Sequence, residues 1–183
     1  TNEGKTCYIA ELGTGTAAIP LALCAELKNL HITSVDYSEQ ILAIAARNIH
    51  SYKNLLEPRN NRLDLVQSDL FSAINFPAKL DFIVSNPPYI PSDKIADLQT
   101  EVSQFEPRNA LDGGKDGLFF YRYLLGAAPS MLKSDGKMIL EIGFDQQPAL
   151  TKLQNRFPAW KSSNFIPDLQ ENARVWILGK ETY

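Results

Sequence analysis

The chain has 183 residues, of which 44% are hydrophobic and 21% are charged, and its formal net charge is -3. This composition is that of a globular protein with a sizeable core, so it excludes disordered and collagen-like chains. A mildly acidic chain is a poor general binder of nucleic acid, because affinity for phosphates comes mainly from clustered Lys and Arg. The sequence contains no apolar run of about 18 residues, and its polar start is unlike a secretory signal peptide.

Short apolar runs alternate with helical segments along the first half of the chain, which is typical of βαβ units and a mostly parallel sheet. The first helix is predicted at 17–27, and Ser38 is expected to cap a second helix that runs to Asn48. The strands of this half are predicted at Cys7–Leu12, Ile32–Asp36, Leu63–Gln67 and Asp81–Ser85.

The regular pattern stops after the fourth strand. Residues 86–116 are rich in Pro and Gly and are predicted to form a loop, and a loop of this length in a compact domain is usually functional. The elements predicted after it are a helix at Leu118–Leu132, a turn at 134–137, a strand at Lys137–Ile142, a helix at Gln146–Phe157 and a closing pair of strands at Trp160–Ile166 and Arg174–Leu178. The sequence therefore predicts one α/β domain over residues 1–183, with about seven strands.

A glycine-rich turn, Glu11-Leu12-Gly13-Thr14-Gly15-Thr16-Ala17, joins the first strand to the first helix. Glycines let a ligand approach the backbone, and the helix N-terminus offers unpaired N–H groups. The spacing suits either a dinucleotide or S-adenosylmethionine. Because Glu11 would repel a pyrophosphate, it favours a ligand that carries an ammonium and a sulfonium.

Acidic residues follow the next two predicted strands. Asp36 ends the second strand, where a carboxylate can accept hydrogen bonds from ribose hydroxyls. Asp69 follows the third strand, where it can accept from an adenine amino group while Leu70 and Phe71 contact the ring; alternatively, Asp69 only caps the next turn. Ligands of open α/β sheets bind at the carboxyl ends of the strands, so these residues are expected to share one cofactor site.

The most specific motif is Asn86-Pro87-Pro88-Tyr89, which follows the fourth strand. The two prolines fix φ near -65°, and Asn86 is pushed to an extended conformation because it precedes a proline. The Asn86 side-chain oxygen and the Pro87 carbonyl are expected to converge as two acceptors beside the flat ring of Tyr89. Two such acceptors suit a planar NH₂ group, which they can orient for attack on a methyl group.

These motifs together resemble the class I S-adenosylmethionine-dependent methyltransferases. Within that superfamily the chain is similar to the HemK/PrmC-type protein-glutamine N5-methyltransferases, which modify peptide chain release factors. The resemblance covers nearly the whole chain. It is carried by the motifs at 11–16, 35–38, 68–71 and 84–90 and by the narrower stretches 105–118, 140–143 and 167–169.

The resemblance implies a Rossmann-like, seven-stranded sheet with an antiparallel last strand. It implies contacts of S-adenosylmethionine with residues 13–17, Asp36, the Asp69–Leu70 step and Asn86, and a substrate glutamine held at Asn86, Pro87, Pro88 and Tyr89. That glutamine belongs to the Gly-Gly-Gln loop of release factors. The chain departs from the family at Ala17, where a third glycine is common. It also lacks the family's N-terminal helical domain, so it is expected to be the catalytic domain of a longer protein.

Two other functions stay open at this point. An Asn-Pro-Pro-Tyr motif also holds the amino groups of adenine or guanine, but residues 90–117 carry three basic and six acidic side chains, which disfavours a phosphate backbone. A dinucleotide-binding oxidoreductase or a silent scaffold would make the motif a coincidence. We expect a cytoplasmic monomer with a release factor as its partner, without a metal site and without direct binding to nucleic acid or membranes.

Overall fold

The computed structural model describes residues 4–76, 78–97 and 108–181, so most of the resembling stretch at 105–118 is included, but Phe105, Glu106 and Pro107 lie outside the described residues. The strands form a seven-stranded sheet in the order β3-β2-β1-β4-β5-β7-β6. The strand bounds are β1 Cys7–Leu12, β2 Leu30–Asp36, β3 Arg62–Gln67, β4 Leu80–Ser85, β5 Leu132–Glu141, β6 Ser162–Pro167 and β7 Ala173–Gly179.

The described helices alternate with these strands as the sequence predicts. The longer ones are α1 Ala18–Glu26, α2 Glu39–Ser51, α6 Phe119–Met131 and α7 Gln147–Gln154. Short helices that the sequence did not reveal are α3 Lys53–Leu56, α5 Arg108–Leu111 and the 3-10 turns at Glu57–Arg59 and Ile95–Asp97. Among the described residues, no helix is long and apolar enough to cross a membrane.

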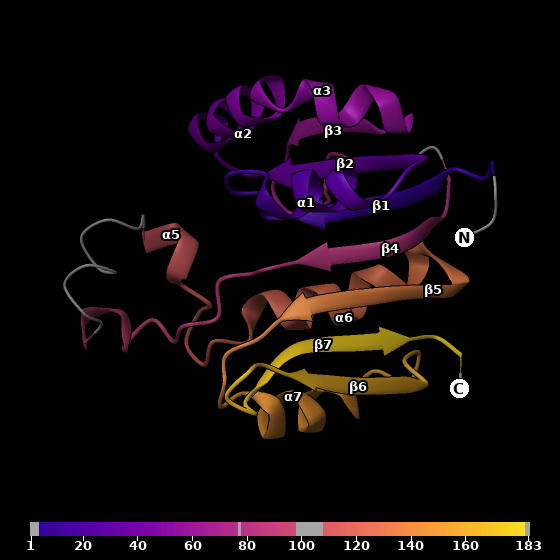
Figure 1. Ribbon diagram of the computed structural model, residues 1–183. Coiled ribbons are helices and arrows are strands. Elements are labelled where there is room, and N and C mark those ends of the chain that lie inside the picture. Colours follow the sequence, from indigo (N-terminus) through magenta and orange to yellow (C-terminus); the bar gives the residue numbers. More distant parts are fainter. Residues whose placement is uncertain (1–3, 77, 98–107, 182–183) are drawn as a thin grey trace. The chain divides into compact units, whose positions relative to one another are not determined.

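The chain divides into two compact units, Thr1–Ser85 with Met131–Gly136, and Asn86–Ser130 with Lys137–Tyr183. In the first unit, β1 pairs in parallel with both β2 and β4, and β2 pairs in parallel with β3. The carboxyl ends of these four strands therefore lie at one edge, toward which their arrowheads point in Figure 1. Ile9, Ile32 and Ile83 are at most 4% exposed, and each such side chain contributes about 1.5–3 kcal/mol by burial.

Helix α2 of the first unit begins where the sequence predicts. The Ser38 side chain accepts a hydrogen bond of 3.3 Å from the backbone N–H of Ile41. This bond satisfies one of the backbone donors that a helix leaves unpaired at its N-terminus. The chain between β2 and α2 is thereby held in a defined turn, which also carries Asp36.

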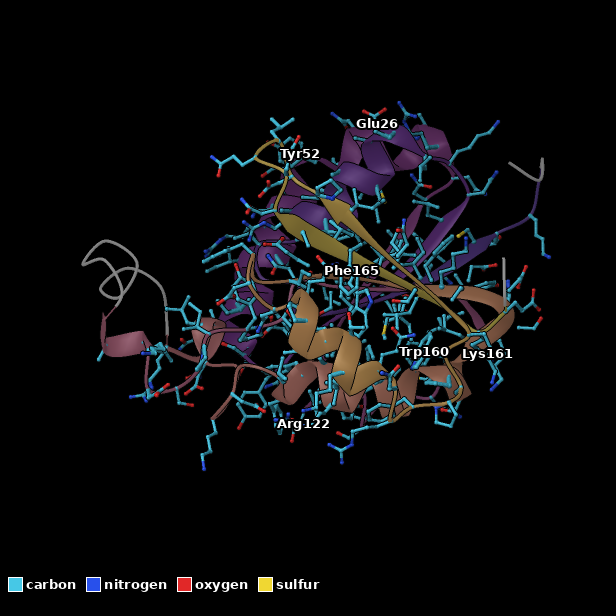
Figure 2. The ribbon with its side chains drawn as sticks, turned by 90° about the horizontal axis from the view of Figure 1, so that it is seen from below. Glu26, Tyr52, Arg122, Trp160, Lys161 and Phe165 are labelled. Carbon is cyan, nitrogen blue, oxygen red and sulfur yellow. The ribbon has the colours of Figure 1, made fainter. Side chains whose placement is uncertain are left out.

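In the second unit, β7 is antiparallel to both β5 and β6, so the antiparallel last strand is confirmed. Figure 1 shows β6 and β7 side by side with opposite directions. Trp176 of β7 is fully buried and stacks on Phe165 with an interplanar angle of 3°. Trp160, labelled with Phe165 in Figure 2, is buried and donates from Nε1 to the Leu125 carbonyl of α6.

The predicted turn at 134–137 is wrong, because β5 already begins at Leu132. The turn was predicted because Ser134, Asp135 and Gly136 are residue types that favour turns. Gly136 allows the strand to continue, since a Cβ added there would lie only 3.0 Å from the backbone oxygen of Leu80. Lys133, one residue inside the strand, pairs with Asp81 of β4 and fixes this early start.

Candidate functional site

The glycine-rich turn of the first unit is held against β2 by backbone hydrogen bonds. Gly13 and Thr14 both donate from their N–H groups to the Val35 carbonyl, at 2.8 and 3.0 Å. Gly13 and Gly15 have φ of 74° and 54°, a region that glycine adopts without strain. Ala17 has φ of 65°, which explains why a glycine is common at this position, and its methyl group is fully buried.

Asp36 connects this turn to the start of α2. Its Oδ2 accepts from the Gly15 N–H at 3.2 Å, and its Oδ1 accepts from the Ser38 N–H at 3.0 Å. The two bonds fix the carboxylate at the carboxyl end of β2, beside the glycine turn. A carboxylate has about four lone-pair sites, so acceptor capacity remains for a ligand hydroxyl.

Asp69 and Leu70 follow β3 at the same edge of the first unit. The preceding residue, Ser68, donates from its N–H to the Asp36 carbonyl at 3.0 Å, which brings this segment to the Asp36 turn. The Asp69 side chain is exposed, and its backbone carbonyl accepts from Ser72. The next turn is thus capped by the Asp69 backbone, while its side chain is left accessible.

Glu11 is the most unusual ionisable group of this unit, because a carboxylate rarely occupies a strand interior. It is 1% exposed, and burial raises its pKa to about 7, with a smaller upward contribution from Asp36. The Thr14 side chain acts in the opposite direction, and so does the Ser34 hydroxyl, which donates to Oε2 of Glu11 at 2.7 Å. The uncharged carboxyl group is therefore substantially populated near neutral pH.

Two buried polar atoms at this turn, Oε1 of Glu11 and Oγ1 of Thr14, make no well-formed hydrogen bond among the described residues, although the Thr14 side chain is near enough to Glu11 to lower the pKa of its carboxyl. Leaving a buried acceptor unpaired costs about 1–3 kcal/mol, so such atoms commonly mark a place where a ligand binds. A carboxylate oxygen suits a cationic nitrogen, and a threonine hydroxyl can donate or accept. These atoms fit the amino acid end of S-adenosylmethionine.

The Asn86-Pro87-Pro88-Tyr89 segment belongs to the second unit. The Asn86 side chain is exposed, whereas Pro87 is buried. The chain after the motif pairs with residues 111–114, since the Ile90 N–H donates to Leu111 and the Gly113 N–H donates to Ile90, at 3.0 and 2.8 Å. We call this pairing of residues 89–92 with residues 111–114 the clasp.

Two glycines allow the clasp to close around the motif. A Cβ added to Gly113 would lie 2.8 Å from the Tyr89 Cα and 2.9 Å from the Pro88 oxygen. A Cβ added to Gly117 would collide with the Tyr89 carbonyl oxygen. Both contacts are with backbone, which cannot move aside as a flexible side chain can, so this part of the Gly-rich stretch serves close packing against the motif.

Two groups of the predicted site residues are thus each assembled within one unit. The first unit brings together Glu11, residues 13–17, Asp36 and the Asp69–Leu70 step, and the second unit holds residues 86–89. Sequence reasoning missed Ser34, the partner of Glu11, although a serine within a buried strand was a signal for it. It also missed Gln146, whose position in the sequence carried no signal of its contacts with Tyr89.

The sequence of the chain matches the methyltransferase small domain family over residues 2–104. The chain belongs to that family. It is also similar to the release factor glutamine methyltransferase of Cereibacter sphaeroides, with 38% identity over 91% of this chain and 57% of that protein, so the resemblance found in the sequence is confirmed. The domain spans about half the length of the curated relatives it matches.

Solved structures share the fold of this methyltransferase domain. A methyltransferase from Pyrococcus furiosus aligns with a TM-score of 0.68 and 20% identity, over 97% of this chain and 76% of that one. The N-terminal domain of human METTL16, solved in complex with SAH, aligns with a TM-score of 0.65 and 15% identity, over 100% of this chain and 64% of that one. The expected class I methyltransferase fold is therefore confirmed.

Proposed function

We propose that this domain transfers a methyl group from S-adenosylmethionine to the side-chain amide nitrogen, N5, of the glutamine in the Gly-Gly-Gln loop of a peptide chain release factor. The observation that carries the proposal is the similarity to release factor glutamine methyltransferases over 81–94% of the chain. The family match over residues 2–104 includes the glycine turn and Asn86–Tyr89. The buried oxygens of Glu11 and Thr14, which make no well-formed hydrogen bond, support the proposed cofactor.

The proposed cofactor site consists of Glu11, Gly13, Thr14, Gly15, Thr16, Ala17, Asp36, Asp69, Leu70 and Asn86. When bound, S-adenosylmethionine supplies an electrophilic methyl group on a positively charged sulfur. Asp36 is assigned to the ribose hydroxyls and Asp69 with Leu70 to the adenine, while Glu11 faces the cationic amino acid end.

Asn86 and Pro87 are assigned to the substrate amide. The Asn86 side-chain oxygen and the Pro87 carbonyl would accept one hydrogen bond each from the two N–H groups, with Pro88 and Tyr89 forming the wall beside them. These bonds orient the nitrogen and stabilise the positive charge that grows on it as the N–C bond forms and the C–S bond breaks. The nitrogen then loses a proton to water, so no strong base is needed before attack.

The test is transfer of labelled methyl from S-adenosylmethionine to a release factor and to its variant with alanine in place of the Gly-Gly-Gln glutamine. We expect label on the first protein and none on the second. Equal labelling of both would reject the assigned residue, and label on RNA or DNA in a parallel reaction would favour the nucleic-acid alternative. Absence of cofactor binding, measured by calorimetry, would reject the methyltransferase activity of this domain.

Replacing Asp36 with alanine is expected to weaken S-adenosylmethionine binding about 10-fold or more, because a hydrogen bond to a charged group contributes about 1.5–3 kcal/mol. The loss of the Gly15 and Ser38 bonds adds to this effect by loosening the turn. Calorimetric titration measures the dissociation constant, with Asp145→Ala, an exposed residue of the second unit, as control. An unchanged constant would remove Asp36 from the site.

The proposal includes a cytoplasmic monomer whose partner is the release factor, because the substrate acts in translation. It includes no direct binding of nucleic acid. Size-exclusion chromatography with light scattering measures the oligomeric state of the domain alone and with the release factor. A stable dimer would reject the proposed monomeric state and would leave the proposed reaction unchanged.

A further inference from the structure

Gln146 lies in the second unit, just before α7, and is 9% exposed. Its side chain makes three hydrogen bonds with backbone groups and one longer contact with the hydroxyl of Tyr121. Nε2 donates to the carbonyls of Tyr89 and Gly117, both at 3.1 Å. Oε1 accepts from the Gly143 N–H at 2.9 Å. It also lies 3.2 Å from the Tyr121 hydroxyl, which shares its one hydrogen with the Glu141 carbonyl at 2.9 Å. Tyr121 stays a donor, because burial raises its pKa further above neutral.

The orientation of this amide is fixed by its partners. Rotating it by 180° would place the oxygen against two carbonyls and the NH₂ group against the Gly143 N–H. The three bonds with backbone groups would then be lost, and buried polar groups that lose their partners cost about 1–3 kcal/mol each. The Gln146 amide is therefore a rigid link among the motif, the segment after the clasp and the end of β5.

The Tyr89 carbonyl that Gln146 binds also lies close to the backbone of Gly117. Gly117 touches the Tyr89 carbonyl closely enough that no side chain fits between them. The Gly117 turn is in turn anchored to α6, because Asp116 accepts two hydrogen bonds from Arg122, at 2.7 and 2.9 Å. Figure 2 shows Arg122 at the surface of that helix. Without the Gln146 side chain, the Tyr89 and Gly117 carbonyls would each lose a hydrogen-bond donor.

We propose that Gln146 is a positioning residue that holds the backbone of Tyr89, and through it the Asn86–Tyr89 acceptors, in the conformation that binds the substrate amide. This inference rests on the proposed function and assigns a residue to it that lies outside the motif. Gln146 acts through Tyr89 and is not expected to touch the substrate or the cofactor. The Pro87 carbonyl and Tyr89 are separated by one rigid proline, so a displacement at Tyr89 is transmitted to the acceptors.

The first measurement is independent of catalysis. Hydrogen–deuterium exchange is compared between the parent, Gln146→Met and Gln147→Met, in which the neighbouring glutamine is exposed. We expect faster exchange of the clasp amides of Ile90 and Gly113 in Gln146→Met alone, and unchanged exchange in β1 and β2. Unchanged exchange of the clasp would overturn the proposal, and so would faster exchange throughout the protein, which would indicate a general loss of stability.

The second measurement is methyl transfer to the release factor. Gln146→Met is expected to lower kcat about 10-fold, because small displacements of positioned groups cost this much or more, with an unchanged cofactor dissociation constant. Gln146→Glu supplies a second readout. Ionised, its carboxylate repels the Tyr89 and Gly117 carbonyls, whereas protonated it donates one bond, so its rate relative to the parent should rise as the pH falls.

The outcomes separate this inference from the proposed function. The positioning role would be overturned if Gln146→Met transferred methyl at the rate of the parent. It would also be overturned if the rate of Gln146→Glu relative to the parent did not depend on pH. If the parent itself modifies no release factor, the proposed function fails, and the exchange measurement still decides whether Gln146 holds the clasp. Loss of cofactor binding in both Gln146 variants would show a role in the fold of the whole domain instead.

Discussion

Alanine in place of Asn86 is expected to lower kcat for methyl transfer by about 100-fold or more, as deletions of a single oriented hydrogen-bonding group at other catalytic sites do. The substrate amide would lose one of its two acceptors, so its nitrogen would be neither oriented nor stabilised as it gains positive charge. Because the Asn86 side chain is exposed, its removal leaves no buried group unpaired, and the fold should be retained. Single-turnover transfer from labelled S-adenosylmethionine measures the effect.

Two comparisons make the Asn86 prediction specific. Calorimetry should give a cofactor dissociation constant close to that of the parent, because Asn86 is one of many residues assigned to the cofactor. Asn164→Ala removes an equally exposed asparagine from β6 and should transfer at the parent rate. The mechanism is wrong if Asn86→Ala also transfers at the parent rate, and the assignment shifts to cofactor binding if its dissociation constant rises in proportion.

The sequence predicted most of the strands and longer helices because short apolar runs alternate with helical segments along the chain. Ser38 is a good example, since a serine before an amphipathic segment satisfies a helix N-terminus whatever the rest of the protein does. The start of β5 was mispredicted for the opposite reason. Ser134, Asp135 and Gly136 favour a turn locally, and only the contacts of this segment with Leu80 and Asp81 keep it extended.

Some residues of the candidate site could be proposed from the sequence, and others could not. Glu11, Gly13 and Asp36 could be found because they stand at the ends of predicted strands, where α/β sheets bind ligands. Gln146 and Ser34 could not be found, because each acts through a partner distant in the sequence, Tyr89 and Glu11 respectively. The residues at the ends of strands can be predicted from local patterns, whereas buried polar links depend on tertiary packing.

In the absence of cofactor, Glu11→Gln is expected to stabilise the domain at neutral and basic pH but not at acidic pH. The Glu11 pKa is about 7 in the folded protein against 4.5 in its ordinary range. The unfolded chain therefore loses the proton first, and the free energy of unfolding falls as the pH rises from 4.5 through 7. A shift of this size corresponds to a stability loss on the order of 3 kcal/mol, at about 1.4 kcal/mol per pKa unit.

Urea unfolding at pH 5 and pH 8 measures this dependence. The difference in unfolding free energy between Glu11→Gln and the parent should be larger at pH 8, where the parent must hold a buried charge beside Asp36. Glu171→Gln, which changes an exposed carboxylate in the turn before β7, should show no such difference. If the advantage of Glu11→Gln were the same at both pH values, the carboxyl of Glu11 would not titrate in this range.

The same substitution should weaken S-adenosylmethionine binding about 10- to 100-fold at pH 8, because it removes the charged partner of a cationic ligand. The substitution is thus expected to raise folding stability and to weaken cofactor binding. Opposite effects of this kind are expected when a buried charge serves ligand binding and destabilises the fold. S-adenosylhomocysteine, which keeps the ammonium but lacks the sulfonium charge, identifies the partner. An equal loss for both ligands places Glu11 at the ammonium, a loss for S-adenosylmethionine alone places it at the sulfonium, and no loss for either removes Glu11 from the cofactor site.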